Sequence, residues 1–188
     1  MTKAKIIKIL KSGGIGVLPT DTLYGLAGLA LNKKTVERIY KVRKRNPKKP
    51  LIILISSLKD LELFGIKLSS PTKKILNKLW PGKVSIILDC PSEKFHYLHR
   101  GTKTLAFRLP NKKSLIDLLK KTGPLAAPSA NLEGQPPAKT IKEAKRFFEN
   151  KIDFYVNAGK LDSLSSTLIE ITGGRITLLR KGAFKLNS

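Results

Sequence analysis

Short apolar runs and amphipathic segments alternate along this chain, and each pattern predicts one kind of element. Apolar runs bounded by glycine, proline or serine predict buried strands, and they cover residues 15–18, 51–55, 84–88, 104–109 and 125–127, with a weaker candidate at 154–156. Apolar positions at helical spacing predict helices, and they cover residues 3–11, 32–43, 56–64, 70–80, 113–121 and 140–149. Residues 91–103 fit neither pattern and are expected to form a loop.

Polar residues at the ends of these segments support their boundaries. Asn32 is a favourable N-cap, and Thr140 with Glu143 forms a capping box. Two apolar runs, 166–171 and 176–179, flank Thr172-Gly173-Gly174-Arg175 and predict a hairpin. Strands that alternate with helices indicate an α/β fold. We therefore expect one α/β domain over residues 1–188, with antiparallel pairing near its C-terminal end.

One stretch departs from both patterns. The strand that ends at Leu18 is followed by Pro19 and then by three small polar residues, Thr20-Asp21-Thr22. This order predicts a buried strand that delivers polar side chains to one place. The alternative is a turn whose threonine and aspartate oxygens bond their own backbone. Pro128-Ser129-Ala130-Asn131 repeats the design after a later strand, which favours the functional interpretation.

Charge is the unusual feature of the composition. The chain has 37 Lys and Arg against 13 Asp and Glu, a net charge of +24. Such a balance favours polyanionic partners, namely nucleic acid, nucleotides or an anionic membrane surface, although a lysine-rich proteome gives the same balance. The sequence has neither an apolar run long enough to span a membrane nor the apolar region of a signal peptide, so we expect no membrane partner and a cytoplasmic location. The single cysteine, Cys90, ends an apolar strand and is expected to be a core thiol.

The common catalytic motifs are missing from the sequence. It contains no P-loop, no nucleophile elbow and no zinc-protease motif. His96 and His99 have no third ligand in register, so they are expected at the surface rather than on a metal. Cations and small hydroxyl or amide residues remain at the strand ends. That set suits the binding of a polyanion and the stabilisation of a charged transition state, not covalent catalysis.

Several cations are candidates for anion recognition. Arg43, Arg45 and Lys49 precede a buried strand and could clamp a triphosphate, although a solvated basic face is the alternative. Arg108 interrupts an apolar strand, where a charge is costly unless an acid or a ligand pairs with it. A structural salt bridge remains possible for Arg108. Arg180 likewise follows apolar strand residues, Leu178 and Leu179, and is a weaker candidate.

Seven segments together resemble one family, the YrdC-like threonylcarbamoyl-AMP synthases. The resemblance covers about residues 6–184. The segments follow the family's order: Pro19-Thr20-Asp21-Thr22-Leu23-Tyr24-Gly25-Leu26, Arg43-Lys44-Arg45 with Pro50-Leu51, Leu79-Trp80-Pro81-Gly82, Arg108 in its strand, Pro128-Ser129-Ala130-Asn131, Ser166-Thr167 and Leu179-Arg180-Lys181-Gly182. The resemblance implies a twisted, mixed open sheet with surrounding helices (a YrdC/RibB-like fold) and a cationic concave face.

The resemblance also implies a reaction and residue roles. L-threonine, bicarbonate and ATP would give threonylcarbamoyl-adenylate, pyrophosphate and water, and a transferase complex would use the adenylate to make threonylcarbamoyladenosine in tRNA. Mg²⁺ would be held largely by phosphates and water, because no carboxylate cage is evident. The implied catalytic residues are Arg45, Ser129 and Asn131; the implied ATP-binding residues are Arg43, Arg45, Lys49, Thr104, Ser129 and Arg180; the implied threonine-binding residues are Thr20, Thr22, Arg108, Ala127 and Ser166.

The chain departs from the family's pattern at a few positions. Arg43 stands where the family has lysine, and Lys49 could supply the missing ammonium. Asn46 follows Arg45 where the family has proline, and Leu54 occupies a position that is histidine in some members, so no role is expected there. The chain ends soon after Gly182, which is expected of the single-domain type.

Two other functions remain open at this stage. One is a non-catalytic protein that binds double-stranded RNA or tRNA through the cationic face. The other is a domain that transfers a carbamoyl group from carbamoyl phosphate, which is less favoured because such domains sit in longer chains. The role of Asp21 also stays open between a metal, an amine and a turn.

Overall fold

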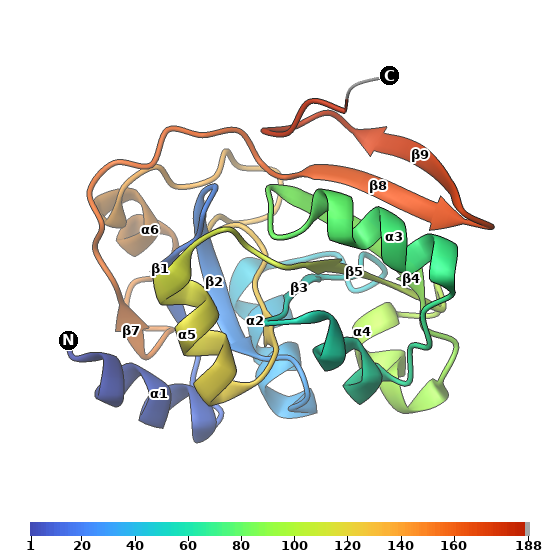
Figure 1. Ribbon diagram of the computed structural model, residues 1–188. Coiled ribbons are helices and arrows are strands. Elements are labelled where there is room, and N and C mark those ends of the chain that lie inside the picture. Colours follow the sequence, from blue (N-terminus) through green and yellow to red (C-terminus); the bar gives the residue numbers. More distant parts are fainter. Residues whose placement is uncertain (187–188) are drawn as a thin grey trace.

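The computed structural model describes residues 1–186, which form a nine-stranded mixed sheet in the order β7-β1-β2-β6-β3-β5-β4-β8-β9 (Figure 1). The strands are β1 (Gly16–Pro19), β2 (Tyr24–Leu29), β3 (Ile52–Leu54), β4 (Val84–Asp89), β5 (Thr104–Arg108), β6 (Leu125–Ala126), β7 (Phe154–Tyr155), β8 (Thr167–Thr172) and β9 (Arg175–Arg180). The helices are α1 (Lys3–Lys11), α2 (Lys33–Arg43), α3 (Ser70–Leu79), α4 (His96–His99), α5 (Lys113–Thr122) and α6 (Ile141–Phe148), with 3₁₀ helices η1 (Leu58–Phe64) and η2 (Glu93–Phe95).

The α/β class and the mixed sheet are confirmed. Pairs β1/β7, β3/β5 and β4/β8 are parallel, and the expected C-terminal hairpin is the antiparallel pair β8/β9. The expected helix starts are confirmed as well. Asn32 Oδ1 accepts a hydrogen bond from the Thr35 amide at 3.1 Å, and Thr140 Oγ1 accepts one from the Glu143 amide at 3.2 Å.

Two expectations about loops were wrong. Residues 91–103 contain η2 and α4, because Phe95 and Leu98 are buried and draw a helical turn against the core. His99 is 0 % exposed rather than on the surface, and its Nδ1 accepts a hydrogen bond from the Gly101 amide at 3.1 Å. Residues 24–29 were also not expected to form a strand, but β2 begins at Tyr24 and leaves a tight turn between two antiparallel strands.

Apolar side chains pack on both faces of the sheet. On one face, Tyr24 and Phe107 join the core formed with α2, α3, α4 and α6. On the other face, Leu18, Ala27 and Leu125 pack against leucines and isoleucines of α1 and α5. Figure 1 shows α1 and α5 next to each other at the end of the sheet that holds β1 and β2.

Helices α1 and α5 cover only part of their face. Side chains alternate across a strand, so Thr104, Ala106 and Arg108 of β5 share this face, while Leu105 and Phe107 point into the opposite core. Thr104 and Ala106, with Ile52 of β3 and Ile87 of β4, are only half-buried. We call the surface formed by Ile52, Ile87, Thr104 and Ala106 the open face.

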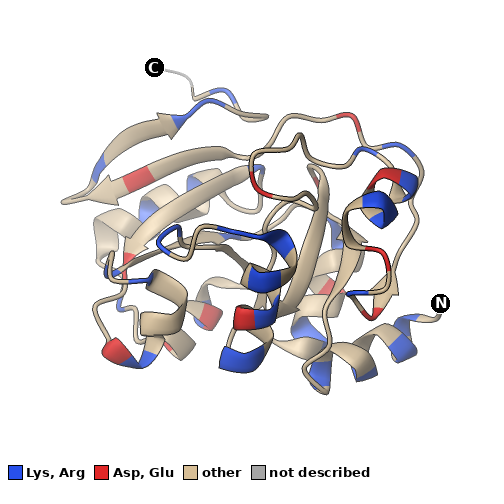
Figure 2. Ribbon diagram, turned by 180° about the vertical axis from the view of Figure 1, so that it is seen from behind, with Lys and Arg blue, Asp and Glu red and all other residues tan. Residues whose placement is uncertain are grey.

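The charged residues lie mainly around the sheet. Figure 2 shows Lys and Arg spread over the helices and connecting loops, with far fewer Asp and Glu between them. Across residues 1–186, no helix combines the length and the apolar character that crossing a membrane requires.

Candidate functional site

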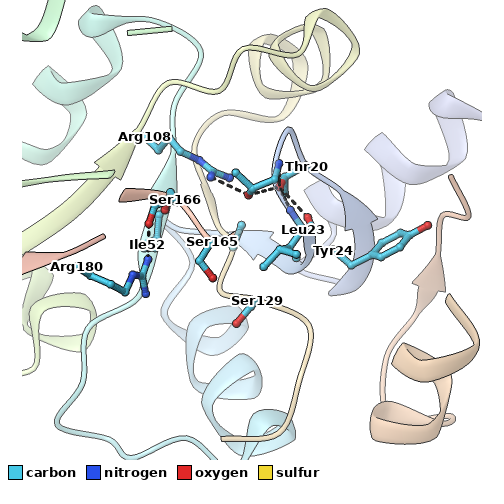
Figure 3. Close-up of a pocket in the computed structure, with 12 residues that line it drawn as sticks. Thr20, Leu23, Tyr24, Ile52, Arg108, Ser129, Ser165, Ser166 and Arg180 are labelled. Carbon is cyan, nitrogen blue, oxygen red and sulfur yellow. Dashed lines mark hydrogen bonds between the residues drawn. The ribbon is translucent and has the colours of Figure 1, made fainter. Parts of the chain in front are cut away.

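A pocket is formed by the β1–β2 turn, the end of β5 and the segment after β6 (Figure 3). The segment before β8 and the last residue of β9 complete it. The pocket has a cavity volume of about 60 Å³, which holds a small group and is below the volume of a site that encloses a drug-sized ligand. Its lining residues are Thr20, Thr22, Leu23, Tyr24, Gly25, Ile52, Arg108, Ala127, Ser129, Ser165, Ser166 and Arg180. Seven of the predicted site residues are therefore brought together: Thr20, Thr22, Arg108, Ala127, Ser129, Ser166 and Arg180.

The β1–β2 turn is closed by the side chain of Thr20. Its Oγ1 accepts hydrogen bonds from the amides of Thr22 at 3.1 Å and Leu23 at 3.2 Å, and donates one to the Leu23 carbonyl at 2.7 Å. Thr20 thus bonds its own backbone, as the turn interpretation proposes. Thr22 differs, because its hydroxyl lies 3.1 Å from Thr20 Oγ1 and faces Arg108.

Arg108 ends β5 with its guanidinium against this turn. Its Nη1 donates to Thr22 Oγ1 at 3.0 Å, and its Nη2 lies 3.3 Å from Asp21 Oδ1. Arg108 is only 4 % exposed, and burial lowers its pKa while Asp21 opposes that shift. Arg108 Nε and Asp21 Oδ1 are buried without a hydrogen-bond partner among the described residues. The guanidinium is therefore incompletely satisfied by the protein, and it borders the pocket.

Asp21 acts as the counter-ion of Arg108 in this structure. Its Oδ2 accepts a hydrogen bond from the Asn111 amide at 3.1 Å, which fixes the carboxylate against the end of β5. Lys112, a residue that the sequence analysis missed, places its ammonium 3.3 Å from the carbonyls of Pro19 and Thr20. The pKa of Lys112 is lowered, because burial lowers it more than the charge of Asp21 raises it. Two cations thus hold the turn, and no local sequence signal distinguishes Lys112 from the other lysines.

Arg180 reaches the pocket because of an irregularity in the hairpin. Leu178 lies opposite Ile169, but Arg180 lies opposite Leu168, so Leu179 is an extra residue in β9. A β-bulge of this kind changes the direction of the next side chain. Arg180 is consequently on the side of the sheet that carries the open face, where its Nη2 donates to the Ser166 carbonyl at 2.9 Å. Burial lowers the pKa of Arg180.

Ser166 and Tyr24 contribute to the pocket in different ways. The Ser166 hydroxyl lies 2.8 Å from that of Ser85, a fully buried residue of β4 that the sequence analysis missed. The Tyr24 ring points away from the pocket in Figure 3, and its hydroxyl donates to the Gly159 carbonyl at 2.7 Å. Tyr24 therefore anchors the neighbouring loop, and its backbone borders the pocket.

Ser129 is linked to a buried network behind the pocket. Its hydroxyl donates to Asn131 Oδ1 at 2.6 Å. Arg43, which is 3 % exposed, donates from Nη2 to the same oxygen and from Nε to the Asn131 carbonyl, both at 3.0 Å. Burial lowers the pKa of Arg43 to about 10. Arg43 was expected to contact ATP, but the structure places it beneath the Ser129–Asn131 turn.

Three other predicted residues lie outside the pocket. Arg45 donates to the carbonyls of Lys49 at 3.1 Å and Pro50 at 2.7 Å. The Lys49 ammonium donates to Glu133 at 2.8 Å. Thr104 is on the open face, at the opposite end of β5 from Arg108. A ligand that contacts both the pocket and these residues must therefore extend along the open face.

No metal site is evident in the part of the chain that the structure describes. Within residues 1–186, no three His, Cys, Asp or Glu side chains gather closely enough to hold an ion. Cys90 is fully buried, its thiol donates to the Phe64 carbonyl at 3.6 Å, and burial raises its pKa to about 11. The expectation of a core thiol is thus confirmed.

Comparisons with known proteins place this geometry in context. Residues 8–182 match the Sua5–YciO–YrdC family model, which is described as "Telomere recombination". Threonylcarbamoyl-AMP synthase of Pyrococcus abyssi is 30% identical over 179 residues, 94% of this chain and 53% of that protein. Threonylcarbamoyl-AMP synthase of Bacillus subtilis is 30% identical over 182 residues, again 53% of its length. The crystal structure of P. abyssi Sua5 complexed with L-threonine superposes with a TM-score of 0.87 at 30% identity, over 97% of this chain and 55% of that one.

The chain thus spans about half the length of these curated relatives. The family match, over residues 8–182, includes every segment that borders the pocket. The relatives' remaining halves have no counterpart in it.

Proposed function

Because this chain belongs to the Sua5–YciO–YrdC family, we propose that it is a threonylcarbamoyl-AMP synthase, a nucleotidyltransferase. It joins L-threonine, bicarbonate and ATP to give threonylcarbamoyl-AMP, pyrophosphate and water. The names of the relatives from P. abyssi and B. subtilis support this activity. The observation that carries the proposal is the buried guanidinium of Arg108, which faces a small, hydroxyl-lined pocket with one nitrogen unpartnered among the described residues.

The buried end of the pocket suits the amino acid. A planar guanidinium matches a carboxylate, so the threonine carboxylate binds Arg108 beside Thr22. The hydroxyl of Ser166 and the small side chain of Ala127 border the same space. The P. abyssi structure that holds L-threonine supports this choice of substrate.

The wider part of the site suits the nucleotide. Ser129 and Arg180 line the pocket, and Thr104 lies on the open face at the other end of β5 from Arg108. Arg45 supplies a further cation beyond Ser129. The phosphates of ATP would then lie against Arg180 and Arg45, whose charges favour a polyanion.

The reaction follows from this placement. The threonine amine adds to the carbon of bicarbonate and water leaves, which forms a carbamate. A carbamate oxygen then attacks the α-phosphorus of ATP, and the bond from that phosphorus to the bridging oxygen of pyrophosphate breaks. The chain's part is to hold the reactants in line and to neutralise charge on the phosphates, which is the main requirement of phosphoryl and nucleotidyl transfer.

Asn131 and Arg43 act behind the contact residues. Asn131 Oδ1 accepts from both Ser129 and Arg43, so its side chain fixes the direction of the Ser129 hydroxyl. We therefore assign Ser129 and Arg45 to contact with the nucleotide, and Asn131 to the orientation of Ser129.

Mg²⁺ would accompany the nucleotide. The nearest carboxylates are already used, since Asp21 pairs with Arg108 and Glu133 pairs with Lys49. These residues do not form a cage for Mg²⁺, which would be held by phosphates and water.

We further propose that the product serves tRNA modification through a separate transferase, and that the chain has affinity for tRNA. The net charge of +24 supports contact with RNA phosphates. RNA affinity measured at several salt concentrations tests this point, because phosphate contacts give a steep salt dependence. Threonine-dependent release of pyrophosphate from ATP tests the enzyme activity itself.

A further inference from the structure

Glu133 connects two parts of the site that are far apart in the sequence. We call residues 44–50, between α2 and β3, the cationic loop. The Glu133 carboxylate accepts hydrogen bonds from the Asn46 amide and, at 2.8 Å, from the Lys49 ammonium. Its own amide donates to the Arg43 carbonyl at 3.0 Å, at the end of α2. One residue therefore contacts the end of α2 and two positions of the cationic loop.

The cationic loop has few other links to the rest of the protein. Inside it, the Lys49 amide donates to the Asn46 carbonyl at 3.2 Å, and the Lys48 amide donates to Asn46 Oδ1 at 2.9 Å. Arg45 is bonded to carbonyls of the same loop. The loop's other contacts are with α2: the Tyr40 hydroxyl donates to the Lys49 carbonyl at 2.9 Å. The Lys44 amide donates to the Lys41 carbonyl at 3.2 Å and the Arg45 amide to the Tyr40 carbonyl at 3.0 Å. The position of the Arg45 guanidinium consequently depends on where this loop is held.

Charge works against a fixed loop conformation. Six of the nine residues from 41 to 49 are Lys or Arg, and like charges at this density repel one another. Glu133 is the acidic residue that forms a salt bridge with the cationic loop within residues 1–186. The Lys49 ammonium and then the Asn46 amide lower the pKa of Glu133. A hydrogen bond between two ionised groups is stronger than a neutral one.

Glu133 also belongs to the turn that carries Ser129. Ser129 and Asn131 are bonded to each other, and Asn131 is bonded to Arg43. The turn over residues 129–133 is therefore attached to the end of α2 at Asn131 and to the cationic loop at Glu133. The two groups of candidate nucleotide contacts, Ser129 and Arg45, are held relative to each other by this turn.

We propose that Glu133 is a positioning residue for ATP: it holds the cationic loop so that Arg45 and Lys49 stand at a fixed distance from Ser129. This inference rests on the proposed function, because ATP is the ligand that would extend from one group to the other. It adds a role for a residue that the sequence motifs do not include.

The test compares ATP binding by titration calorimetry for the wild-type chain, Glu133→Ala and Glu133→Gln, without threonine. Loss of the carboxylate is expected to weaken ATP binding about tenfold, since it removes a charge-assisted hydrogen bond and the Asn46 contact. Glutamine keeps one acceptor oxygen, for either the Asn46 amide or the Lys49 ammonium, and is expected to recover only part of the affinity. Asp162→Ala is the matched control, because it removes an exposed carboxylate that is paired with Lys139 at 2.6 Å away from the pocket.

A second measurement separates positioning from charge alone. Hydrogen exchange of the Asn46 amide is expected to accelerate in Glu133→Ala but not in Lys49→Ala, which leaves the Asn46 contact in place. Unchanged ATP affinity and unchanged exchange in Glu133→Ala would overturn the inference. Threonine-dependent product formation by the same wild-type preparation reports on the proposed function separately: if it occurs while Glu133→Ala binds ATP normally, the positioning role alone is wrong.

Discussion

The guanidinium of Arg108 donates a hydrogen bond from Nη1 to the Thr22 hydroxyl at 3.0 Å, across 86 positions of sequence. This contact joins the end of β5 to the β1–β2 turn at the buried end of the pocket. It also separates the roles of the two threonines, because Thr20 is bonded to the turn itself. The buried end of the pocket is therefore built from a strand end and a turn that the protein holds together by charge.

Arg108→Ala is expected to abolish threonine-dependent activity and to destabilise the fold. It leaves Asp21 buried without its counter-ion, and breaking a buried pair on one side costs about 3–5 kcal/mol. Urea unfolding measures this loss. The double variant Arg108→Met/Asp21→Asn removes both charges and is expected to regain most of the stability but none of the activity. Recovery of activity in the double variant would contradict the role of Arg108 in binding the carboxylate.

Thr20→Val and Thr22→Val are expected to differ. Thr20→Val removes three hydrogen bonds that close the turn, so we expect a loss of stability of about 1–3 kcal/mol. Thr22→Val keeps the turn closed and is expected mainly to raise the KM for threonine. Thermal unfolding and steady-state kinetics on both variants check this. Equal effects of the two substitutions on stability and on KM would show that the distinction is wrong.

Arg43→Lys keeps a cation at this position, but we expect it to lower kcat. Lysine cannot donate to both oxygens of Asn131 as Arg43 does, so Ser129 loses its fixed direction. The expected loss of stability is about 1–2 kcal/mol. An activity equal to that of the wild type, with unchanged stability, would show that Asn131 orients Ser129 without Arg43.

Cys90 predicts a pH effect on stability. Burial raises the pKa of its thiol to about 11 from a model-peptide value of 9.0. Between these values the unfolded chain loses the proton while the folded chain keeps it, so the thiol lowers stability as pH rises through this window. Two pKa units correspond to about 2–3 kcal/mol. Between pH 8 and pH 10.5, the free energy of unfolding measured in urea is expected to fall less steeply for Cys90→Ala than for the wild type. Identical slopes would contradict the assignment.

Apolar periodicity predicted much of the fold. Apart from β2, which the apolar runs did not include, the strands and longer helices are close to where the runs and amphipathic segments placed them, because each buries one face or one stripe against the sheet. Phe95 and Leu98 were missed because two buried side chains in one short turn give no readable period. His99 was consequently expected at the surface.

The site was only partly readable from the sequence. The motifs identified Thr22, Arg108 and Ser166, which all line one pocket. The strand order decides which other distant residues lie beside them. The pairs Asp21 with Arg108 and Ser85 with Ser166 depend on that order, and periodicity does not specify it. The bulge that directs Arg180 has no composition signal either.

The most direct test of the central proposal is pyrophosphate release by the purified chain with ATP, L-threonine and bicarbonate. We predict release that requires all three substrates, together with a labile adenylate, and none from the folded double variant Arg108→Met/Asp21→Asn. A folded wild-type chain that releases no pyrophosphate in response to threonine would contradict the account. Tight, salt-dependent RNA binding by that inactive chain would instead support a non-catalytic RNA-binding protein.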